Sequence, residues 1–124
     1  MSTSNGNAGG ISIHAVDVSR GVPAAGLAVR LLRADGDRQL VAQGICKAGG
    51  HFEHPVSSGV GVGRGLYQIE FDVAAYYRAN QVTIPSPAFL EVAVFRFGID
   101  HVEEHFHLPF KFTPWGFSLF RGGA

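Results

Sequence analysis

The sequence predicts an all-β fold, a β-sandwich of about eight strands with one short helix. Short segments in which apolar and polar residues alternate follow one another along most of the chain. Clusters of glycine, proline and aspartate separate these segments at the spacing that is typical of sandwich turns. The 124 residues suit one domain, which we expect to cover residues 11–124 after a disordered tail, rich in Ser, Asn and Gly, at residues 1–10.

The first half of the chain contains four predicted strands, Ile11–Val18, Leu27–Leu32, Leu40–Cys46 and a short one at His51–Pro55. In the first strand the apolar positions alternate with Ser12 and His14, which predicts that these two polar side chains share the opposite face. Turn signals separate the strands at residues 20–23, 35–37 and 47–50. The glycine-rich residues 57–65 form a loop, because they lack the Lys-Ser/Thr pair of a phosphate-binding loop and no helix follows them.

The second half predicts a strand, the helix, and then the last three strands. These elements are a strand at Leu66–Phe71, a helix at Val73–Asn80, long strands at Phe89–Ile99 and Val102–Phe112, and a last strand at Phe117–Arg121. Asp72 precedes the helix and is a suitable N-cap residue. Pro85 and Pro87 end the segment that follows the helix, and Asp100-His101 separates the two long strands.

The composition is apolar for so small a domain. Hydrophobic residues make up 46% of the chain and charged residues only 16%. A small domain has much surface, so part of this apolar surplus lies outside its own core and predicts an oligomer. The 10 basic and 10 acidic residues balance, so the chain has no basic stripe of the kind that binds nucleic acid.

Cysteine content and hydropathy favour the cytoplasm. Cys46 is the only cysteine, so no disulfide can form within the chain, and no catalytic motif surrounds it. The first ten residues lack the basic and apolar regions of a secretory signal. No apolar run reaches the roughly 18 residues that cross a bilayer, so we expect no membrane partner.

Six histidines are the residues best able to carry chemistry: His14, His51, His54, His101, His105 and His107. In a strand, His105 and His107 project to the same face, while Phe106 between them points into the core. Two imidazoles on one face can bind a metal ion or share proton transfer, because histidine titrates near neutrality.

Plainer interpretations of these histidines stay open. His105 and His107 can be a solvated pair on an exposed strand, since polar residues lie mostly outside. His14 alone is typical of a solvent-facing strand histidine. A zinc site needs at least three ligands, of which His14 would be the third, and the spacing does not favour it. We therefore predict no metal site.

Four ordered segments carry more specific motifs. They are Ile11–Asp17 with Gly21–Ala25, Tyr67–Asp72 with Ala75–Tyr77, Glu104–Pro109, and Pro114–Gly123. Together they resemble the signatures of the transthyretin/5-hydroxyisourate hydrolase family from about Ile11 to Gly123. The third resembles its His-aromatic-His-hydrophobic-Pro strand, and the fourth resembles its C-terminal signature, which ends Tyr-Arg-Gly-Ser.

The resemblance implies a transthyretin-like β-sandwich that assembles as a homotetramer, a dimer of dimers, with the active site in the cleft between dimers. It implies the hydrolytic opening of a purine-derived lactam ring in urate breakdown, without a cofactor. By position, His14 and His105 match the family's two catalytic histidines, and His107 matches the second histidine of that strand, where it would contact the substrate.

This sequence departs from the family at two places. The family has an Asp-Gly-Arg turn whose Arg polarises the substrate, and the best match here, Gly49-Gly50-His51, puts His51 at that position. Lys47 is an alternative source of the cation. At the C-terminus, Phe120 and Gly123 stand where the family has Tyr and Ser, whereas Arg121 and Gly122 remain. Phe120, Arg121 and Gly123 are the further substrate-binding candidates.

Two functions follow from these residues. In the first, one histidine draws a proton from water, the other orients the water or protonates the leaving nitrogen, and a cation or N–H group stabilises the oxyanion. Because His, Phe and Gly make the pocket less polar than Arg, Tyr and Ser, the substrate would be more apolar, such as an N-methylated hydroxyisourate. The alternative is a transthyretin-like small-ligand binding protein without catalysis, although retention of both His14 and His105 favours hydrolysis.

Overall fold

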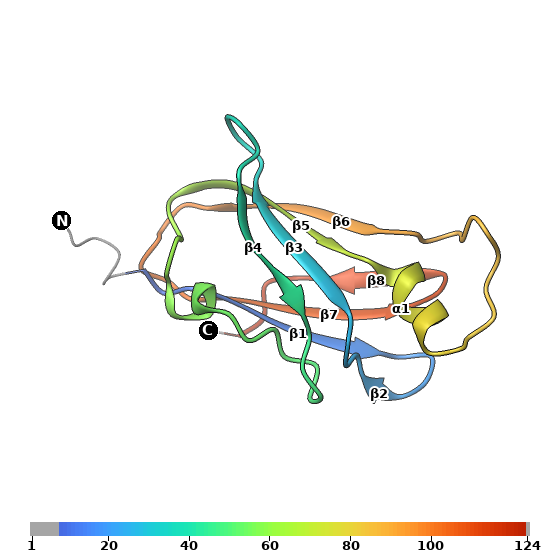
Figure 1. Cartoon of the computed structure of the whole chain (residues 1–124). Coiled ribbons are helices and arrows are strands. Elements are labelled where there is room, and N and C mark those ends of the chain that lie inside the picture. Colours follow the sequence, from blue (N-terminus) through green and yellow to red (C-terminus); the bar gives the residue numbers. More distant parts are fainter. Residues whose placement is uncertain (1–7, 124) are drawn as a thin grey trace.

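Two four-stranded sheets pack face to face in the computed structural model, which describes residues 8–123 (Figure 1). The elements are β1 (Ile11–Asp17), β2 (Val22–Pro23), β3 (Ala28–Arg33), β4 (Leu40–Ile45), β5 (Gly65–Phe71), α1 (Val73–Ala79), β6 (Ala93–Ile99), β7 (Phe106–Thr113) and β8 (Gly116–Leu119). Eight strands and one short α-helix confirm the predicted all-β sandwich. None of the helices within the described range is long and apolar enough to span a membrane.

One sheet has the strand order β2-β1-β7-β8, and the other has the order β4-β3-β5-β6. Every pairing is antiparallel except that of β1 with β7, which run parallel at the centre of the first sheet. Its register places Ser12 opposite His107 and His14 opposite Pro109. This pairing joins two segments that lie more than ninety residues apart, and it brings the histidine motifs at the two ends of the chain together.

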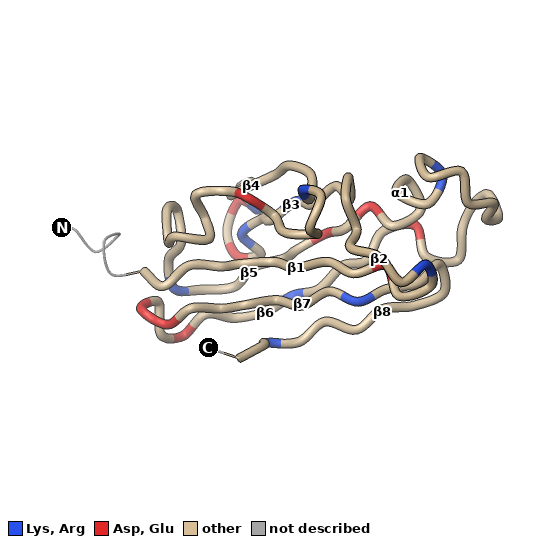
Figure 2. Tube along the Cα trace, turned by 90° about the horizontal axis from the view of Figure 1, so that it is seen from below, with Lys and Arg blue, Asp and Glu red and all other residues tan. Residues whose placement is uncertain are grey.

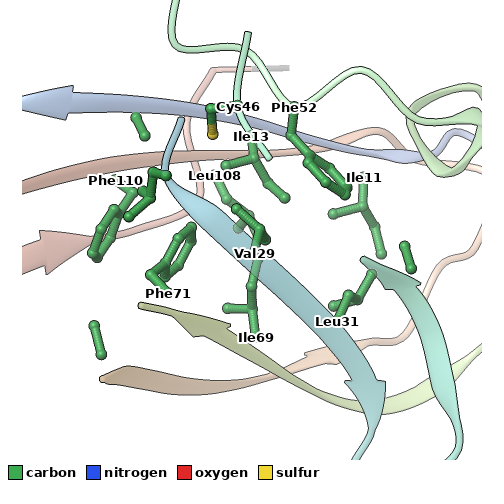
Figure 3. Close-up of a cluster of buried hydrophobic side chains, with 14 of the residues drawn as sticks. Ile11, Ile13, Val29, Leu31, Cys46, Phe52, Ile69, Phe71, Leu108 and Phe110 are labelled. Atoms are coloured by element: carbon green, nitrogen blue, oxygen red, sulfur yellow. The ribbon is translucent and has the colours of Figure 1, made fainter. Parts of the chain in front are cut away.

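The core lies between the sheets and is filled by alternate residues of the central strands (Figure 3). Members of this core from β1, β3, β5 and β7 are fully or almost fully buried, among them Ile11, Ile13, Val29, Leu31, Ile69, Phe71, Leu108 and Phe110. The rings of Phe71 and Phe110 stack across the two sheets at 3.8 Å. Because side chains alternate along a strand, burial of this set turns Ser12, His14 and His107 to the outer face of the first sheet.

Several predicted strands are shorter than the alternation indicates. The predicted strand at His51–Pro55 was wrong: His51 makes only an isolated bridge with His14, and Pro55–Ser58 form a 3-10 turn. His54 Nδ1 accepts the Val56 N–H at 3.0 Å and fixes the start of that turn. The residues before β7 lie outside that strand because a turn takes their backbone groups: Glu104 N–H donates to the His101 carbonyl. Before β6, the Glu91 carbonyl accepts from Ala74 N–H of α1 instead of a neighbouring strand.

Asp72 stands at the N-cap position of α1, as predicted, but its carboxylate does not cap the helix. Instead it accepts two hydrogen bonds from the Arg30 guanidinium, at 2.9 and 3.1 Å. Arg30 also donates to Glu70, and these two carboxylates hold the pKa of its guanidinium above the ordinary value. A charge-assisted bidentate pair outcompetes the weaker cap interaction.

The predicted disordered tail was too long at its inner end. Residues 8–10 lie against the sandwich: Gly9 N–H donates to the Val102 carbonyl at 2.9 Å, and the Gly10 carbonyl accepts from Phe106 N–H at 2.9 Å. A side chain at Gly9 would collide with the backbone of Glu104 and His105, so only glycine permits this approach. The rest of the predicted tail, residues 1–7, lies outside the described residues.

Charged residues are unevenly distributed over the sandwich (Figure 2). Acidic residues gather at the turn between β6 and β7, where Asp100, Glu103 and Glu104 follow one another closely. β1 carries only one charged residue, the buried Asp17. On β7 the outward positions carry His107, Pro109, Lys111 and Thr113, so Lys111 is the one lysine or arginine that these two strands place on the outer face.

Candidate active site

Four of the six histidines gather on the outer face of the β1–β7 pair. His14 lies on β1 and His107 on β7, while His51 and His105 come from the segments next to these strands. His14, His105 and His107 are half-buried and His51 is exposed. This grouping results from the parallel pairing of β1 with β7, which the sequence alone does not reveal.

Ser12 connects the two histidines of the β7 motif. Its hydroxyl oxygen lies 2.7 Å from His105 Nε2 and 2.7 Å from His107 Nδ1. The other nitrogen of His105, Nδ1, lies 2.6 Å from the Gly9 carbonyl oxygen. Both ring nitrogens of His105 are thus engaged, whereas the bonds that the structure gives His107 use only Nδ1 and leave Nε2 available to a reactant.

His14 and His51 form the second pair. Their rings stack with centroids 4.4 Å apart and planes 18° from parallel. His14 Nε2 donates to the Gly49 carbonyl at 3.0 Å, so the same turn that carries His51 also orients His14. Ala15 N–H donates to the Gly50 carbonyl and Phe52 N–H to the Ile13 carbonyl, which attaches this turn to β1.

The surroundings of His107 favour its neutral form. Burial lowers the pKa of His107 below the ordinary value of 6.5, and repulsion from His105, His14 and His51 lowers it further. A neutral imidazole with a free nitrogen is the form that accepts a proton from water. Geometry and electrostatics therefore both suit His107 to general-base chemistry.

The C-terminal segment covers one side of this cluster. Gly122 N–H donates to the His107 carbonyl at 2.7 Å. A Cβ atom at Gly122 would lie only 3.0 Å from the His107 ring and 3.1 Å from Pro109, so glycine allows the close approach. The residues that follow β8 therefore run back along β7 toward its start (Figure 1).

Arg121 fastens this segment to the β7 motif. Its guanidinium donates to Glu104 at 3.1 Å and to the His105 carbonyl at 3.2 Å, and it lies over the Phe106 ring at 3.9 Å. Phe120 and Gly123 are exposed beside it, and a side chain at Gly123 would meet open space. Of the cation candidates, His51 lies within the cluster, whereas Lys47 is exposed and contacts the turn through its backbone.

The other two histidines lie outside the cluster. His54 caps the 3-10 turn and stacks on Phe52, and the exposed His101 pairs with Asp100 at 2.9 Å. Among residues 8–123, no three His, Cys, Asp or Glu side chains are placed to hold a metal ion. Cys46 is buried, and burial raises the pKa of its thiol to about 11, which makes it a poor nucleophile.

Sequence reasoning missed three residues of this arrangement: Ser12, Gly9 and Gly122. Alternation along β1 places Ser12 on the same face as His14, and that was the one available signal. Its contacts with His105 and His107 depend on the register of β1 against β7. Gly9 and Gly122 act through their backbone, so their residue type reveals only that a close approach is possible.

We expect Gly50→Ala to disrupt the His14–His51 pair. Gly50 is buried with φ +86°, and a Cβ atom there would collide with the Ala15 carbonyl oxygen and lie 3.3 Å from the His14 ring. The left-handed conformation alone costs an L-residue about 1–2 kcal/mol. Chemical denaturation should show at least that loss of unfolding free energy.

Gly49→Ala is the matched control for this substitution. A Cβ atom at Gly49 would meet only the His51 ring, at an ordinary distance of 3.4 Å. Equal stability losses in the two variants would contradict the assignment of Gly50 as the residue that permits the turn.

This arrangement combines the groups that acyl-transfer hydrolysis requires. It has a base with a free nitrogen on His107 and, on the exposed His51, an imidazole that can donate an N–H. Histidine is the most common general acid and base at neutral pH. The cluster is therefore suited to proton transfer at a carbonyl that water attacks.

Comparison with known proteins agrees with this chemistry. The sequence matches the HIUase/transthyretin family over residues 11–122. It is 36% identical to the 5-hydroxyisourate hydrolase of Pseudomonas aeruginosa over 115 residues, which cover 92% of this chain and 91% of that protein.

Solved structures share the fold. The crystal structure of (S)-allantoin synthase superposes with a TM-score of 0.85 at 28% identity and covers 94% of this chain, which corresponds to 44% of that chain. Sea bream transthyretin in complex with thyroxine superposes with a TM-score of 0.79 at 25% identity, over 92% of this chain and 95% of that one. These matches confirm the transthyretin-like fold that the sequence motifs predicted.

Proposed function

This chain belongs to the HIUase/transthyretin family, and on that premise we propose that it hydrolyses the lactam ring of 5-hydroxyisourate or of a close, purine-derived relative. Relatives between 32% and 36% identical over most of the chain are 5-hydroxyisourate hydrolases, which supports a hydrolase of purine catabolism. The observation that carries the proposal is the cluster of His14, His51, Ser12, His105 and His107 on one sheet face.

In this proposal His107 is the general base, whereas the resemblance assigns catalysis to His105 and substrate contact to His107. The reason is that both ring nitrogens of His105 are engaged, while Nε2 of His107 is not engaged by any of residues 8–123. The free Nε2 of His107 takes a proton from water while the water oxygen attacks the ring carbonyl carbon. The C–N bond of the resulting tetrahedral intermediate then breaks, the ring nitrogen receives that proton from His107, and the former carbonyl carbon becomes the carboxyl group of the same, ring-opened molecule. The lowered pKa of His107 supports this role, because the base is neutral before it acts.

His51 stabilises the developing oxyanion, and His14 keeps the His51 ring oriented. The exposed imidazole of His51 can donate an N–H to the carbonyl oxygen, and its stacking on His14 limits its rotation. His14 itself is oriented through the Gly49 carbonyl. His105 is held between Gly9 and Ser12 and stabilises the proton that His107 acquires. These steps require no cofactor.

We further propose that the substrate is less polar than unmodified 5-hydroxyisourate, with an N-methylated hydroxyisourate as the example. The exposed Phe120 and the open space at Gly123 support this, since neither side chain supplies a hydrogen-bond donor or acceptor. A site without such groups does not strongly reject an analogue that lacks the matching polar groups. The guanidinium of Arg121 is engaged with Glu104 and the His105 carbonyl. We therefore expect Arg121 to act on the substrate indirectly, by holding the C-terminal segment in place.

A homotetramer, built as a dimer of dimers, would close this open face. Within the described residues β6 pairs only with β5 and β8 only with β7, so one edge of each strand is unpaired. Phe117 and Phe120, on and just beyond β8, are 40% and 47% exposed. Open edges and exposed apolar side chains favour association with a second copy. Native mass spectrometry should give a tetramer, and an active monomer would contradict this arrangement.

The experiment follows the ultraviolet decay of freshly generated 5-hydroxyisourate, with and without the protein, beside an N-methylated analogue. We expect the protein to accelerate both decays, with the methylated compound turned over at least as well. Turnover of the unmethylated compound far above the analogue would refute the less polar substrate but leave the hydrolase intact. No acceleration of either compound would favour the alternative, a small-ligand binding protein without catalysis.

A general base at His107 also determines how the rate of hydrolysis changes with pH. Because the neutral form of His107 acts and its pKa in the free protein lies below 6.5, kcat/KM should fall as the pH is lowered through a midpoint below 6.5 and level off at higher pH. The pH at half-maximal kcat/KM measures this pKa. A midpoint above 6.5, or a rate that rises on acidification, would be inconsistent with His107 as the base.

A further inference from the structure

Ser12 bridges two histidines of the candidate active site. Its hydroxyl is within 2.7 Å of one nitrogen of each ring, and it is the side-chain partner that the structure gives to both. A serine hydroxyl has a single proton, so it can donate to only one of these nitrogens and must accept from the other. The direction of the hydrogen bonds therefore decides which nitrogen of each ring carries a proton.

The Gly9 carbonyl sets this direction. A carbonyl oxygen only accepts hydrogen bonds, so His105 Nδ1, 2.6 Å away, carries the proton and donates it. In the neutral ring His105 Nε2 is then unprotonated and accepts the Ser12 hydroxyl proton. With that proton committed to His105, the Ser12 oxygen accepts from His107 Nδ1.

The chain of hydrogen bonds ends at His107 and determines which of its nitrogens is unprotonated. Since Nδ1 carries the proton of neutral His107, Nε2 has a free lone pair. That is the nitrogen to which the structure assigns no partner within the described residues, and it is the atom that must face a reactant. The opposite tautomer would place a proton on Nε2 and make His107 unable to accept one from water.

We propose that Ser12 is a positioning residue that holds neutral His107 as the Nδ1–H tautomer, with His105 and the Gly9 carbonyl imposing the direction. The catalytic consequence rests on the proposed hydrolytic function, whereas the tautomer does not. Ser12 belongs to β1 and His107 to β7, directly opposite in the parallel register, so the rigid centre of the sheet keeps the two side chains in contact. The Gly9 backbone is fixed in turn by its bond to Val102.

The test combines nitrogen NMR with kinetics on the full chain. Long-range proton–nitrogen correlation spectra of histidine-labelled protein distinguish the two neutral tautomers, and a His107→Gln variant assigns the His107 signal. In the unmodified protein at neutral pH we expect His107 as Nδ1–H. In Ser12→Ala we expect the Nε2–H form or a mixture, with kcat lower by about tenfold, which corresponds to the net contribution of one hydrogen bond.

Two further variants separate positioning from a merely structural role. Ser12→Thr keeps the hydroxyl in a residue that suits a strand, so it should retain the Nδ1–H signal and most of the activity. Ser58→Ala, which removes an exposed hydroxyl at the end of the 3-10 turn, should change neither measurement. An unchanged His107 tautomer in Ser12→Ala overturns the proposal whatever the activity. A changed tautomer in a protein that shows no turnover supports the positioning role and contradicts the hydrolytic function.

Discussion

His107→Gln should lower kcat for ring opening by about 10²–10⁴-fold, the contribution that a positioned general base makes. Glutamine keeps a polar side chain of comparable length but cannot take up a proton at neutral pH. The substitution removes the one imidazole of the β7 motif whose Nε2 is free, and it leaves Ser12 a partner for its oxygen. Initial rates of ultraviolet decay at saturating substrate measure the effect, with unfolding curves recorded beside them.

His101→Gln provides the matched control for this substitution. His101 is exposed, pairs with Asp100, and lies outside the cluster, so its replacement should change kcat by less than about twofold, in line with ordinary surface changes. His105→Gln should be less severe than His107→Gln, because His105 acts through its neighbours. A near-normal rate in His107→Gln combined with an inactive His105→Gln would assign the base to His105 instead.

Asp17→Ala should lower the free energy of unfolding by about 3–5 kcal/mol, as expected when one member of a buried charged network is removed. The Asp17 carboxylate is fully buried at the end of β1. It accepts hydrogen bonds from Tyr77 at 2.6 Å, Tyr76 at 3.1 Å and Ser19 at 2.8 Å, and Arg20 lies 3.6 Å away. This network attaches helix α1 to the first sheet.

The energetic reason is that two buried phenol groups lose their acceptor. Burial and the neighbouring carboxylate raise the pKa of both Tyr76 and Tyr77, so the hydroxyls stay protonated and need a partner. A buried donor without a partner costs about 1–3 kcal/mol. Tyr77→Phe removes one donor and leaves Asp17 its other bonds, so it should cost less than Asp17→Ala. Urea denaturation measures both variants, and a loss below about 1 kcal/mol in Asp17→Ala would show that the network contributes little.

Asp17 also shows what sequence patterning can and cannot predict. Alternation along β1 predicts correctly that Ile11, Ile13 and Ala15 face the core, and the same alternation puts Asp17 there. The tyrosines that satisfy its carboxylate come from α1, about sixty residues away, and no local signal links them to β1. Binary patterning therefore predicts the inward face of a strand but not the partners of a polar residue on it.

The predicted strand boundaries were wrong where local hydrogen bonds compete with the pairing of strands. Val102 has the same parity as the inward-facing Phe106 of β7, but Glu104 between them is polar, and the bond from Glu104 N–H to the His101 carbonyl turns the chain there. His105 consequently lies just before β7 and points toward Gly9 rather than continuing the ladder. The sequence predicts that His105 and His107 share a face, whereas only the backbone path reveals that both nitrogens of His105 are engaged and, within the part of the chain that the structure describes, one nitrogen of His107 is free.

The grouping of His14 with His105 and His107 followed from the motifs and not from spacing. A parallel pairing between the first and the penultimate strand cannot be read from alternation, because neighbouring strands in a sandwich are often distant in sequence. The turn before His51 was correctly located by its two glycines, whereas the stacking of His51 on His14 depends on how that turn meets β1.

The central claim is that water opens the ring of the substrate on the histidine face. Its most direct test is a single-turnover reaction in ¹⁸O-labelled water, with the protein in excess over 5-hydroxyisourate. The reaction is quenched, and the masses of the products are measured by mass spectrometry. We predict a ring-opened product carrying one ¹⁸O atom in its new carboxyl group, formed at a rate that rises with protein concentration and falls in His107→Gln. Retention of intact substrate on the protein, with the ring-opened product forming no faster than in buffer, would contradict the claim and identify a binding protein.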